Sequence, residues 1–321
     1  MPATGAADDL ARSLAGVPGL DLRRGAPLAR MTTLRIGGPA ELLVEVGSEP
    51  ALARLLRACN EAGLELHLLG LGSNVLIPDA GLDGVVARLS GDLRRVRLSG
   101  RRVSAGAGAA LAQVARRAAK AGLAGLEALA GFPSTVGGAV RMNAGCYGAE
   151  IRDVLVSVRL VERDGTRRRV ATAELEPGYR TTALERTGGI VTRALFELAP
   201  GDPQTLLARM EELNSRRWAS LPSGHPTAGS IFKNPPGDHA GRLIDACGLK
   251  GEQVGGAQIS PKHANVIVNT GGARASDVVD LMERARAAVL ERFGVQLAPE
   301  IVLLGALGRD WARTTGRVAT E

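Results

Sequence analysis

Aromatic residues are scarce in this chain of 321 residues, where Phe, Trp and Tyr together make up 2% of the composition. The hydrophobic core must therefore be built from Leu, Val, Ile and Ala. Cysteine is almost as rare: Cys59, Cys146 and Cys247 lie far apart, and no Cys-x-x-Cys pair occurs. No disulfide framework and no metal site is therefore expected, and a reducing compartment fits this composition.

Lysine and long apolar runs are also lacking. Only four of the 40 basic residues are lysines, although the formal net charge is +7. No basic block with interleaved aromatic residues occurs, so nucleic-acid binding is not expected. The excess of arginine is either solvated surface or an attraction for anionic ligands such as phosphates. No apolar stretch of about 18 residues could span a membrane, and the acidic N-terminus is unlike a signal peptide. We expect a cytoplasmic protein without membrane contact.

Strand and helix patterns alternate irregularly along the chain, which is typical of the α+β class. Ser48 is expected to cap a helix that Gly63 closes, and Gly294 to close a long helix that begins at Ser276. Asp164-Gly165 predicts a hairpin tip whose two turn positions both take positive φ. Other strands are expected within residues 41–46, 64–77, 93–109, 154–175, 188–201, 264–269 and 295–305, and other helices over 109–121, 203–217 and 239–247. A polar leader with one short helix is expected over 1–30, and a loose polar tail after 308.

Three glycine-rich segments carry most of the functional information: TTLRIGGPA at 32–40, GLGSNVLI at 70–77 and GFPSTVGGAVRMNAGCYG at 131–148. Glycine allows backbone N–H groups to converge on an anion. Each segment alone is also compatible with a tight turn, but three of them together favour a dinucleotide site. The Rossmann fingerprint is incomplete, since Val75 and Leu111 stand where its third glycine should be, and no P-loop occurs.

Ser230 lies in the segment PTAGSIFKNP at 226–235. A nucleophile elbow requires G-x-S-x-G, but Ala228 and Phe232 occupy the two glycine positions. A nucleophilic serine is therefore not supported. From composition alone, a turn serine and a proton donor both stay open.

Six ordered motifs extend this pattern: GLGSNVLIPDAG, GFPSTVGGAVRMNAGCYG, PGYRTT, AGSIFKNP, GGAQISPKHANVIVN and FGVQLAPEIVLLG. Together they resemble the UDP-N-acetylenolpyruvoylglucosamine reductase (MurB) family, from about Thr32 to Gly308. The resemblance implies an α+β protein with an FAD-binding domain of the PCMH (vanillyl-alcohol-oxidase-like) type, followed by a smaller α+β substrate-binding domain. No tyrosine lies between Arg180 and Ser230, so the chain resembles the shorter family type, which lacks a tyrosine-bearing insertion.

The resemblance also implies a reaction and a division of the chain. NADPH reduces a non-covalently bound FAD, which then reduces UDP-N-acetylglucosamine enolpyruvate to UDP-N-acetylmuramate for peptidoglycan, and hence for cell-wall biogenesis, cell shape and division. After the leader, the FAD-binding domain is expected over 31–200, with two subdomains that meet near residue 90. The substrate domain follows over 201–308 and the tail over 309–321. A monomer is expected.

The family's catalytic residues match Ser230 as proton donor, Arg180 as partner of the substrate carboxylate, and Glu300. Thr182 replaces the serine that usually follows the arginine by two. Cys146 is expected to be a packed small side chain. The implied substrate ligands are Asn234, Lys233, Arg217 and His263; for the last two, a solvated helix end and a structural histidine are the alternatives. The expected flavin-binding residues are Arg35, Gly70, Gly72, Ser73, Asn74, Val75, Leu76, Pro133, Ser134, Thr135, Gly137, Gly138, Asn143, Ala144, Gly145 and Ile190.

Two other functions are weighed against this one. Another FAD-dependent oxidoreductase with a PCMH-type domain would share the glycine-rich segments, but AGSIFKNP and LAPEI argue against it. A non-catalytic nucleotide-sugar binder would be favoured by loss of the three catalytic residues, and all three are present.

Overall fold

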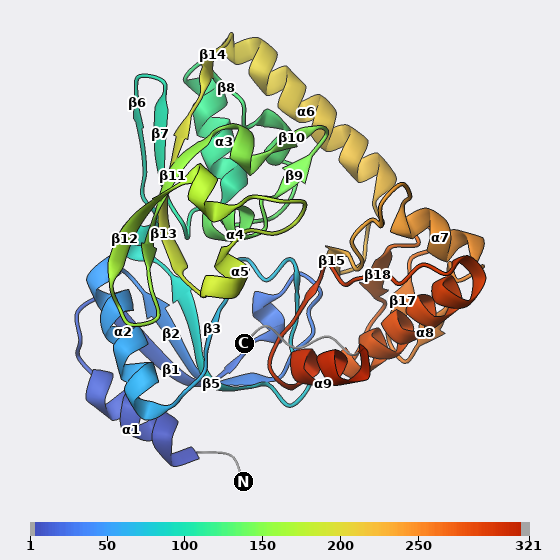
Figure 1. Cartoon of the computed structure of the whole chain (residues 1–321), viewed down its shortest axis with the longest axis horizontal. Coiled ribbons are helices and arrows are strands. Elements are labelled where there is room, and N and C mark those ends of the chain that lie inside the picture. Colours follow the sequence, from blue (N-terminus) through green and yellow to red (C-terminus); the bar gives the residue numbers. More distant parts are fainter. Residues whose placement is uncertain (1–3, 316–321) are drawn as a thin grey trace.

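The computed structural model describes residues 4–315, which form three sheets of four or five strands with helices around them (Figure 1). The first sheet has the strand order β1-β2-β5-β3, in which β1 is antiparallel to β2 and the other pairs are parallel. The elements of this part are α1 (Thr4–Leu14), β1 (Leu20–Pro27), β2 (Pro39–Val46), α2 (Glu49–Ala62), β3 (Leu66–Leu68), β4 (Val75–Leu76) and β5 (Leu82–Leu89).

The predicted ends of α2 are confirmed. The Ser48 hydroxyl accepts from the Ala51 amide at 3.3 Å, and Gly63 ends the helix with φ of 65°. Strand β1, by contrast, was not foreseen within the expected leader. It is an edge strand whose Arg23 and Arg24 are exposed, so the alternation of apolar and polar residues that reveals a strand is weak there.

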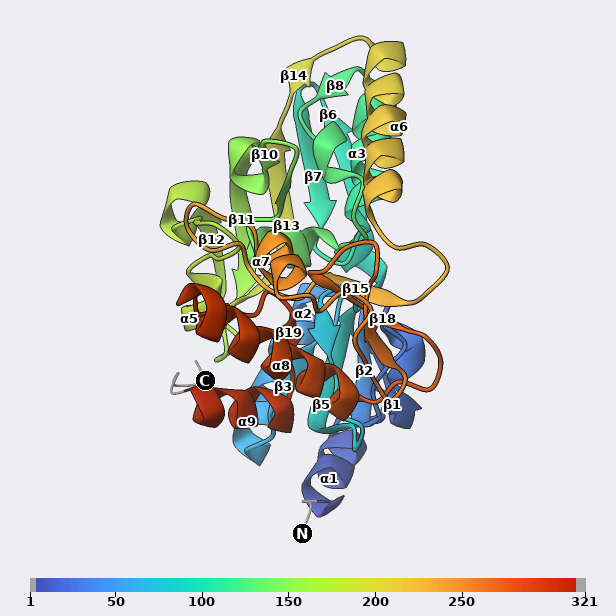
Figure 2. The ribbon, with the colours of Figure 1, turned by 90° about the vertical axis from the view of Figure 1, so that its right-hand side faces the viewer.

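The second sheet is antiparallel, in the order β12-β11-β13-β7-β6. Helix α4 packs on β13 and β7, and α6 runs along α3 towards the C-terminal part (Figures 1 and 2). The elements are β6 (Val96–Ser99), β7 (Arg102–Gly106), α3 (Leu111–Lys120), β8 (Leu123–Ala124), α4 (Val136–Arg141), β9 (Gly145–Cys146), β10 (Ala149–Glu150), β11 (Leu155–Val161), β12 (Arg167–Ala171), α5 (Leu184–Thr187), β13 (Ile190–Glu197), β14 (Ala199–Pro200) and α6 (Pro203–Ser220).

The hairpin predicted at Asp164-Gly165 forms as β11–β12, but its turn differs from the prediction. The strands expected within 93–109 also pair, as the hairpin β6–β7. Gly165 has φ of 84°, whereas Asp164 does not adopt positive φ. The Glu162 amide donates to the Thr166 carbonyl at 2.8 Å, so three residues connect the paired positions. A three-residue loop needs one left-handed glycine at its end, which is why the two-residue turn was the wrong prediction.

The third sheet has the antiparallel order β15-β18-β17-β16, and α8 packs against β16 and β17. Helix α8 ends at Gly294, with φ of 66°, as predicted. The elements are β15 (Thr227–Ser230), α7 (Ala240–Ala246), β16 (Gln253–Val254), β17 (Ala257–Ile259), β18 (Val266–Asn269) and α8 (Ala275–Phe293).

The end of the described chain departs most from the sequence predictions. The strand expected over 295–305 is reduced to β19 (Val302–Leu303), which pairs in parallel with β4. The tail expected to be loose after residue 308 is instead helical in α9 (Ala306–Thr315), where Trp311 is buried. Residues 316–321 of that tail lie outside the described residues. A buried aromatic at one position gives no periodic signal in an otherwise polar segment, so the helix was missed.

Two large cores follow from this arrangement. One is continuous between the first two sheets and includes Leu55 and Phe196. The other fills the C-terminal part around Leu281, yet it also takes in Leu34 and Leu76 from the beginning of the chain. The C-terminal part is thus anchored by apolar residues of the N-terminal part. Across residues 4–315, no helix has the length and apolarity that crossing a membrane requires.

Candidate active site

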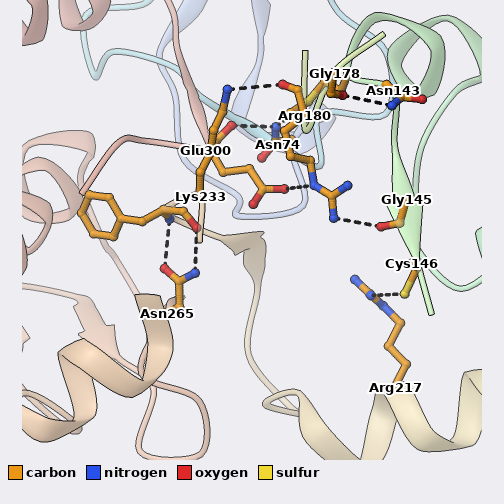
Figure 3. Close-up of polar contacts among 12 residues, drawn as sticks. Asn74, Asn143, Gly145, Cys146, Gly178, Arg180, Arg217, Lys233, Asn265 and Glu300 are labelled. Carbon is orange, nitrogen blue, oxygen red and sulfur yellow. Dashed lines mark hydrogen bonds and ion pairs between the residues drawn. The ribbon is translucent and has the colours of Figure 1, made fainter. Parts of the chain in front are cut away.

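Arg180 and Glu300 form an ion pair where the second sheet faces the C-terminal part (Figure 3). The guanidinium Nε donates to the carboxylate Oε1 at 2.8 Å, and the side chains are only 21% and 17% exposed. Partial burial strengthens the attraction relative to a surface pair. The pair therefore brings together two motifs that lie far apart in the sequence.

The Arg180 side chain is directed by a strained tight turn. The Gly178 amide donates to the Thr181 carbonyl at 3.1 Å, and Arg180 itself has φ of 56°, a left-handed conformation that costs energy for a side chain larger than glycine. The guanidinium Nη2 donates to the Gly145 carbonyl at 2.8 Å, and the guanidinium carbon lies 5.2 Å from the centre of the Tyr179 ring. Strain at this residue is thus balanced by contacts that fix its direction.

Glu300 is held through its backbone as well as its side chain. Its amide donates to the Ile231 carbonyl at 2.7 Å, and its carbonyl accepts from the Asn74 side chain at 3.0 Å. Burial raises the pKa of the Glu300 carboxyl above its ordinary value of 4.5, although the nearby Arg180, Lys233 and Arg217 act in the opposite direction. Burial is the larger effect, so the neutral form of Glu300 is easier to reach than in water.

Ser230 is the last residue of β15 and precedes Ile231, to which the Glu300 amide is bonded. Its side chain is partly exposed, and within residues 4–315 its hydroxyl makes no hydrogen bond. The preceding Gly229 has φ of 79° and open space around it. The Ser230 hydroxyl has no hydrogen-bond partner among the described residues and follows a left-handed glycine, so it is available to a ligand.

The four expected substrate ligands lie differently. Lys233 is close to the ion pair, since its Nζ donates to the Arg180 carbonyl at 3.3 Å. Arg217, near the end of α6, approaches the Cys146 sulfur at 3.9 Å (Figure 3). The Asn234 side-chain oxygen accepts from the Ala240 amide at 3.1 Å. His263 lies in the loop before β18, where burial lowers the pKa of its imidazole.

The loop from Gly70 to Asn74 has the properties of an anion cradle. None of its five backbone amides donates a hydrogen bond to any other described residue. A Cβ at Gly72 would lie 2.2 Å from the Met31 carbonyl oxygen, and one at Gly70 would lie 2.8 Å from the Thr135 hydroxyl. Side chains are thus excluded while the N–H groups stay free, which suits the diphosphate of a dinucleotide.

The other expected flavin residues surround this loop. The Ser73 hydroxyl donates to the Pro133 carbonyl, and Thr135 caps α4 by accepting from the Gly138 amide at 3.2 Å. Gly137 packs against Ala107, since a Cβ added at Gly137 would lie 3.0 Å from the Ala107 Cβ. Arg35, Ser134 and Ala144 lie in the flanking loops, Val75 and Leu76 form β4, Gly145 begins β9 and Ile190 begins β13. Asn143 is buried, and its side chain makes hydrogen bonds with the Glu150 carboxylate, the Gly178 carbonyl and the Arg152 amide.

Sequence reasoning missed Asn265. This buried side chain accepts from the Phe232 amide at 2.9 Å and donates to the Phe232 carbonyl at 2.8 Å (Figure 3). The Asn265 side chain thus supplies the backbone of Phe232 with the two hydrogen bonds that a neighbouring strand would otherwise make. An asparagine immediately before the apolar run VIVN was the available signal.

Two family models match the chain. The C-terminal domain of UDP-N-acetylenolpyruvoylglucosamine reductase matches residues 221–304, and the FAD binding domain matches residues 40–171. The second match contains the Gly70–Asn74 loop, and the first contains both Ser230 and Glu300.

Curated relatives and a solved structure agree with these matches. UDP-N-acetylenolpyruvoylglucosamine reductase 2 of Symbiobacterium thermophilum is 45% identical, over 92% of this chain and 95% of its own length. The reductase of Anaeromyxobacter dehalogenans (strain 2CP-C) is also 45% identical, over 94% and 90%. The crystal structure of UDP-N-acetylenolpyruvylglucosamine reductase (MurB) from Thermus caldophilus has a TM-score of 0.77 at 40% identity, covering 89% of this chain and 99% of that one.

Proposed function

Because this chain belongs to the UDP-N-acetylenolpyruvoylglucosamine reductase (MurB) family, we propose that Arg180, Glu300 and Ser230 carry out the family's reaction. That reaction is the NADPH-dependent reduction of UDP-N-acetylglucosamine enolpyruvate to UDP-N-acetylmuramate, a step of peptidoglycan precursor synthesis. The observation that carries the assignment is the partly buried Arg180–Glu300 ion pair, which joins the FAD-binding part to the C-terminal part.

FAD is the cofactor, and the glycine-rich loops of this chain fit it. When bound, it takes reducing equivalents from NADPH and delivers them as a hydride to the alkene of the substrate. The free amides of the loop from Gly70 to Asn74 would hold its diphosphate, and the Ser73–Pro133 hydrogen bond would keep the two loops together around it. The expected flavin residues near these loops, apart from Asn143, are proposed to complete the site.

Arg180 is proposed to bind the carboxylate of the substrate. Its Nε and Nη2 are engaged by Glu300 and Gly145, whereas its Nη1 makes no hydrogen bond among the described residues. The free edge of a guanidinium can donate to a carboxylate that gains negative charge during reduction. Lys233 adds positive charge nearby, since its Nζ lies against the Arg180 carbonyl.

Ser230 is proposed to give a proton to the carbon next to that carboxylate. A serine hydroxyl is a weak acid, but a carbanion-like carbon is a far stronger base, so no histidine is required beside it. Glu300 has a raised pKa and can stay close to the substrate carboxylate in its neutral form. Asn234, Arg217 and His263 are proposed to contact the remainder of the UDP-sugar.

The test replaces Ser230 with Ala and follows the two halves of the reaction separately. NADPH should still bleach the bound flavin at the wild-type rate, whereas reoxidation by the enolpyruvyl substrate should slow by at least about 100-fold. Ser223→Ala, at an exposed position in the preceding loop, is the control and should leave both rates unchanged. Reoxidation of S230A at the wild-type rate would remove Ser230 from the mechanism.

The remaining assignments concern the molecule as a whole. We propose that residues 31–200 form the FAD-binding domain, with subdomains meeting near residue 90, and that 201–308 form the substrate domain. A cytoplasmic monomer is proposed. Gel filtration with light scattering tests the oligomeric state, and a mass of twice 33.3 kDa would contradict it.

A further inference from the structure

Asn143 is a buried polar side chain near the site that makes three hydrogen bonds with the protein. It is 1% exposed and has φ of 40°, a left-handed conformation. Its Nδ2 donates to the Glu150 carboxylate and to the Gly178 carbonyl, both at 3.0 Å, and its Oδ1 accepts from the Arg152 amide at 3.0 Å. Both N–H bonds of the amide are therefore used within the protein, and Figure 3 shows the one to Gly178.

The first of these contacts acts on the backbone of Arg180. Gly178 begins the tight turn in which Arg180 has positive φ, and its amide closes that turn onto Thr181. The hydrogen bond from Asn143 to the Gly178 carbonyl fixes the same peptide from the other side. A turn that contains a strained residue persists only where surrounding contacts stabilise it, and the buried hydrogen bond from Asn143 to Gly178 is such a contact.

The second contact acts on the partner of the Arg180 guanidinium. Glu150 pairs with Gly145 across the short β9–β10 hairpin, and the Gly145 carbonyl accepts from Arg180 at 2.8 Å. By holding Glu150, Asn143 also fixes the strand that carries this acceptor. The buried Asn143 amide thus connects the backbone turn that carries Arg180 to the hairpin whose Gly145 carbonyl binds the Arg180 guanidinium.

We infer that Asn143 is the positioning residue for Arg180, rather than a side-chain ligand of the flavin. It sets the direction of the guanidinium towards Glu300 and the substrate carboxylate. The inference rests on the function proposed for Arg180. A displacement of about 1 Å in such a group costs up to about 100-fold in rate, which sets the size of the expected effect.

The test uses Asn143→Gly in the FAD-loaded enzyme. Glycine accepts φ of 40° without strain, so this variant removes the side chain and leaves the backbone conformation allowed. FAD occupancy and flavin reduction by NADPH should stay within about threefold of wild type, while reoxidation by the enolpyruvyl substrate falls by roughly 10- to 100-fold. Glu176→Gly is the control, since Glu176 is exposed and also has positive φ, 46°; both of its half-reactions should be unchanged.

A double-mutant cycle with Arg180→Ala separates positioning from a general effect on folding. If Asn143 acts through Arg180, then N143G should add less than about a threefold loss of reoxidation in the R180A background. The inference would be overturned if N143G slowed reoxidation by the same factor with and without Arg180. Loss of FAD from N143G, or an unchanged reoxidation rate in N143G, would also overturn it.

Two further outcomes are distinguishable. If R180A is reoxidised at the wild-type rate, both the role proposed for Arg180 and this inference are overturned. If R180A is reoxidised slowly and N143G slows it further by the same factor as in the wild-type background, this inference alone is overturned. If N143G does not fold, Asn143→Asp carries the same comparison. It keeps the oxygen that accepts from Arg152 and loses both donors, so it should show the same non-additive defect.

Discussion

The side-chain amide of Asn74 donates to the backbone carbonyl of Glu300 at 3.0 Å. Immediately beyond this contact, Val302 and Leu303 pair in parallel with Val75 and Leu76. The proposed diphosphate loop therefore continues into β4, whose partner strand β19 begins two residues after the proposed catalytic glutamate. A change in the loop should therefore affect both the binding of FAD and the position of Glu300.

Gly72→Ala is expected to release FAD and destabilise the protein. At φ of 64° the new Cβ would lie 2.2 Å from the Met31 carbonyl oxygen, so both backbone strain and a clash with backbone oppose it. The cost should exceed about 2 kcal/mol, measured by thermal unfolding, with loss of flavin absorbance after gel filtration. Gly63→Ala is the matched control: its φ is 65° but nothing lies within 4 Å, so about 1 kcal/mol and full FAD occupancy are expected. Equal losses in both variants would contradict the prediction.

Arg180→Lys should slow reoxidation by the enolpyruvyl substrate by about 100-fold while flavin reduction stays near wild type. A lysine cannot bond Glu300 and Gly145 at once and still present a free edge to a carboxylate. Rapid-mixing absorbance of the flavin gives both rates. Arg186→Lys, in an exposed pair with Glu176, is the control and should behave as wild type. A wild-type reoxidation rate for Arg180→Lys would show that one positive charge suffices.

Glu300→Gln should change the pH dependence of stability in a defined direction. The folded-state pKa of Glu300 is raised by burial, so its favourable contribution is present below its ordinary value of 4.5 and is lost as the pH rises through the folded pKa. Denaturant unfolding should therefore show the stability of wild type relative to the Gln variant falling as the pH rises above 4.5. A difference that grows with pH would mean that the pairing with Arg180 outweighs burial.

Glu212 provides the opposite control for that experiment. Hydrogen bonding to Arg209 lowers the pKa of this exposed carboxyl. Its contribution is present above its ordinary pKa and is lost as the pH falls through the lowered one. Relative to Glu212→Gln, wild type should thus lose stability on acidification, in contrast to the Glu300 comparison.

Asn265→Ala should destabilise the C-terminal part by about 2 to 4 kcal/mol. Removing the buried side chain leaves both the amide and the carbonyl of Phe232 without partners. Asn234→Ala, at an exposed residue with one hydrogen bond to the Ala240 amide, should cost about 1 kcal/mol. Urea unfolding measures both values, and a cost for Asn265→Ala no larger than that for Asn234→Ala would contradict the structural role of Asn265.

The fold class and most elements could be predicted because their signals are local. The cap at Ser48, the left-handed glycines at 63 and 294 and the alternation around Asp164 each depend on neighbours a few residues away, and the structure bears out the elements they mark. The elements that were missed lack such a signal. Strand β1 is an exposed edge, and β19 exists only because β4 lies beside it.

The sequence by itself determined the family, the FAD-binding part and the motifs that contain Ser230, Arg180 and Glu300, because each motif is a short run of residue types. Only the tertiary structure decided how these motifs meet. The Arg180–Glu300 pair spans 120 positions, and the three hydrogen bonds of Asn143 join segments from Asn143 to Gly178. No spacing rule encodes such contacts, since they arise where independently folded segments pack together.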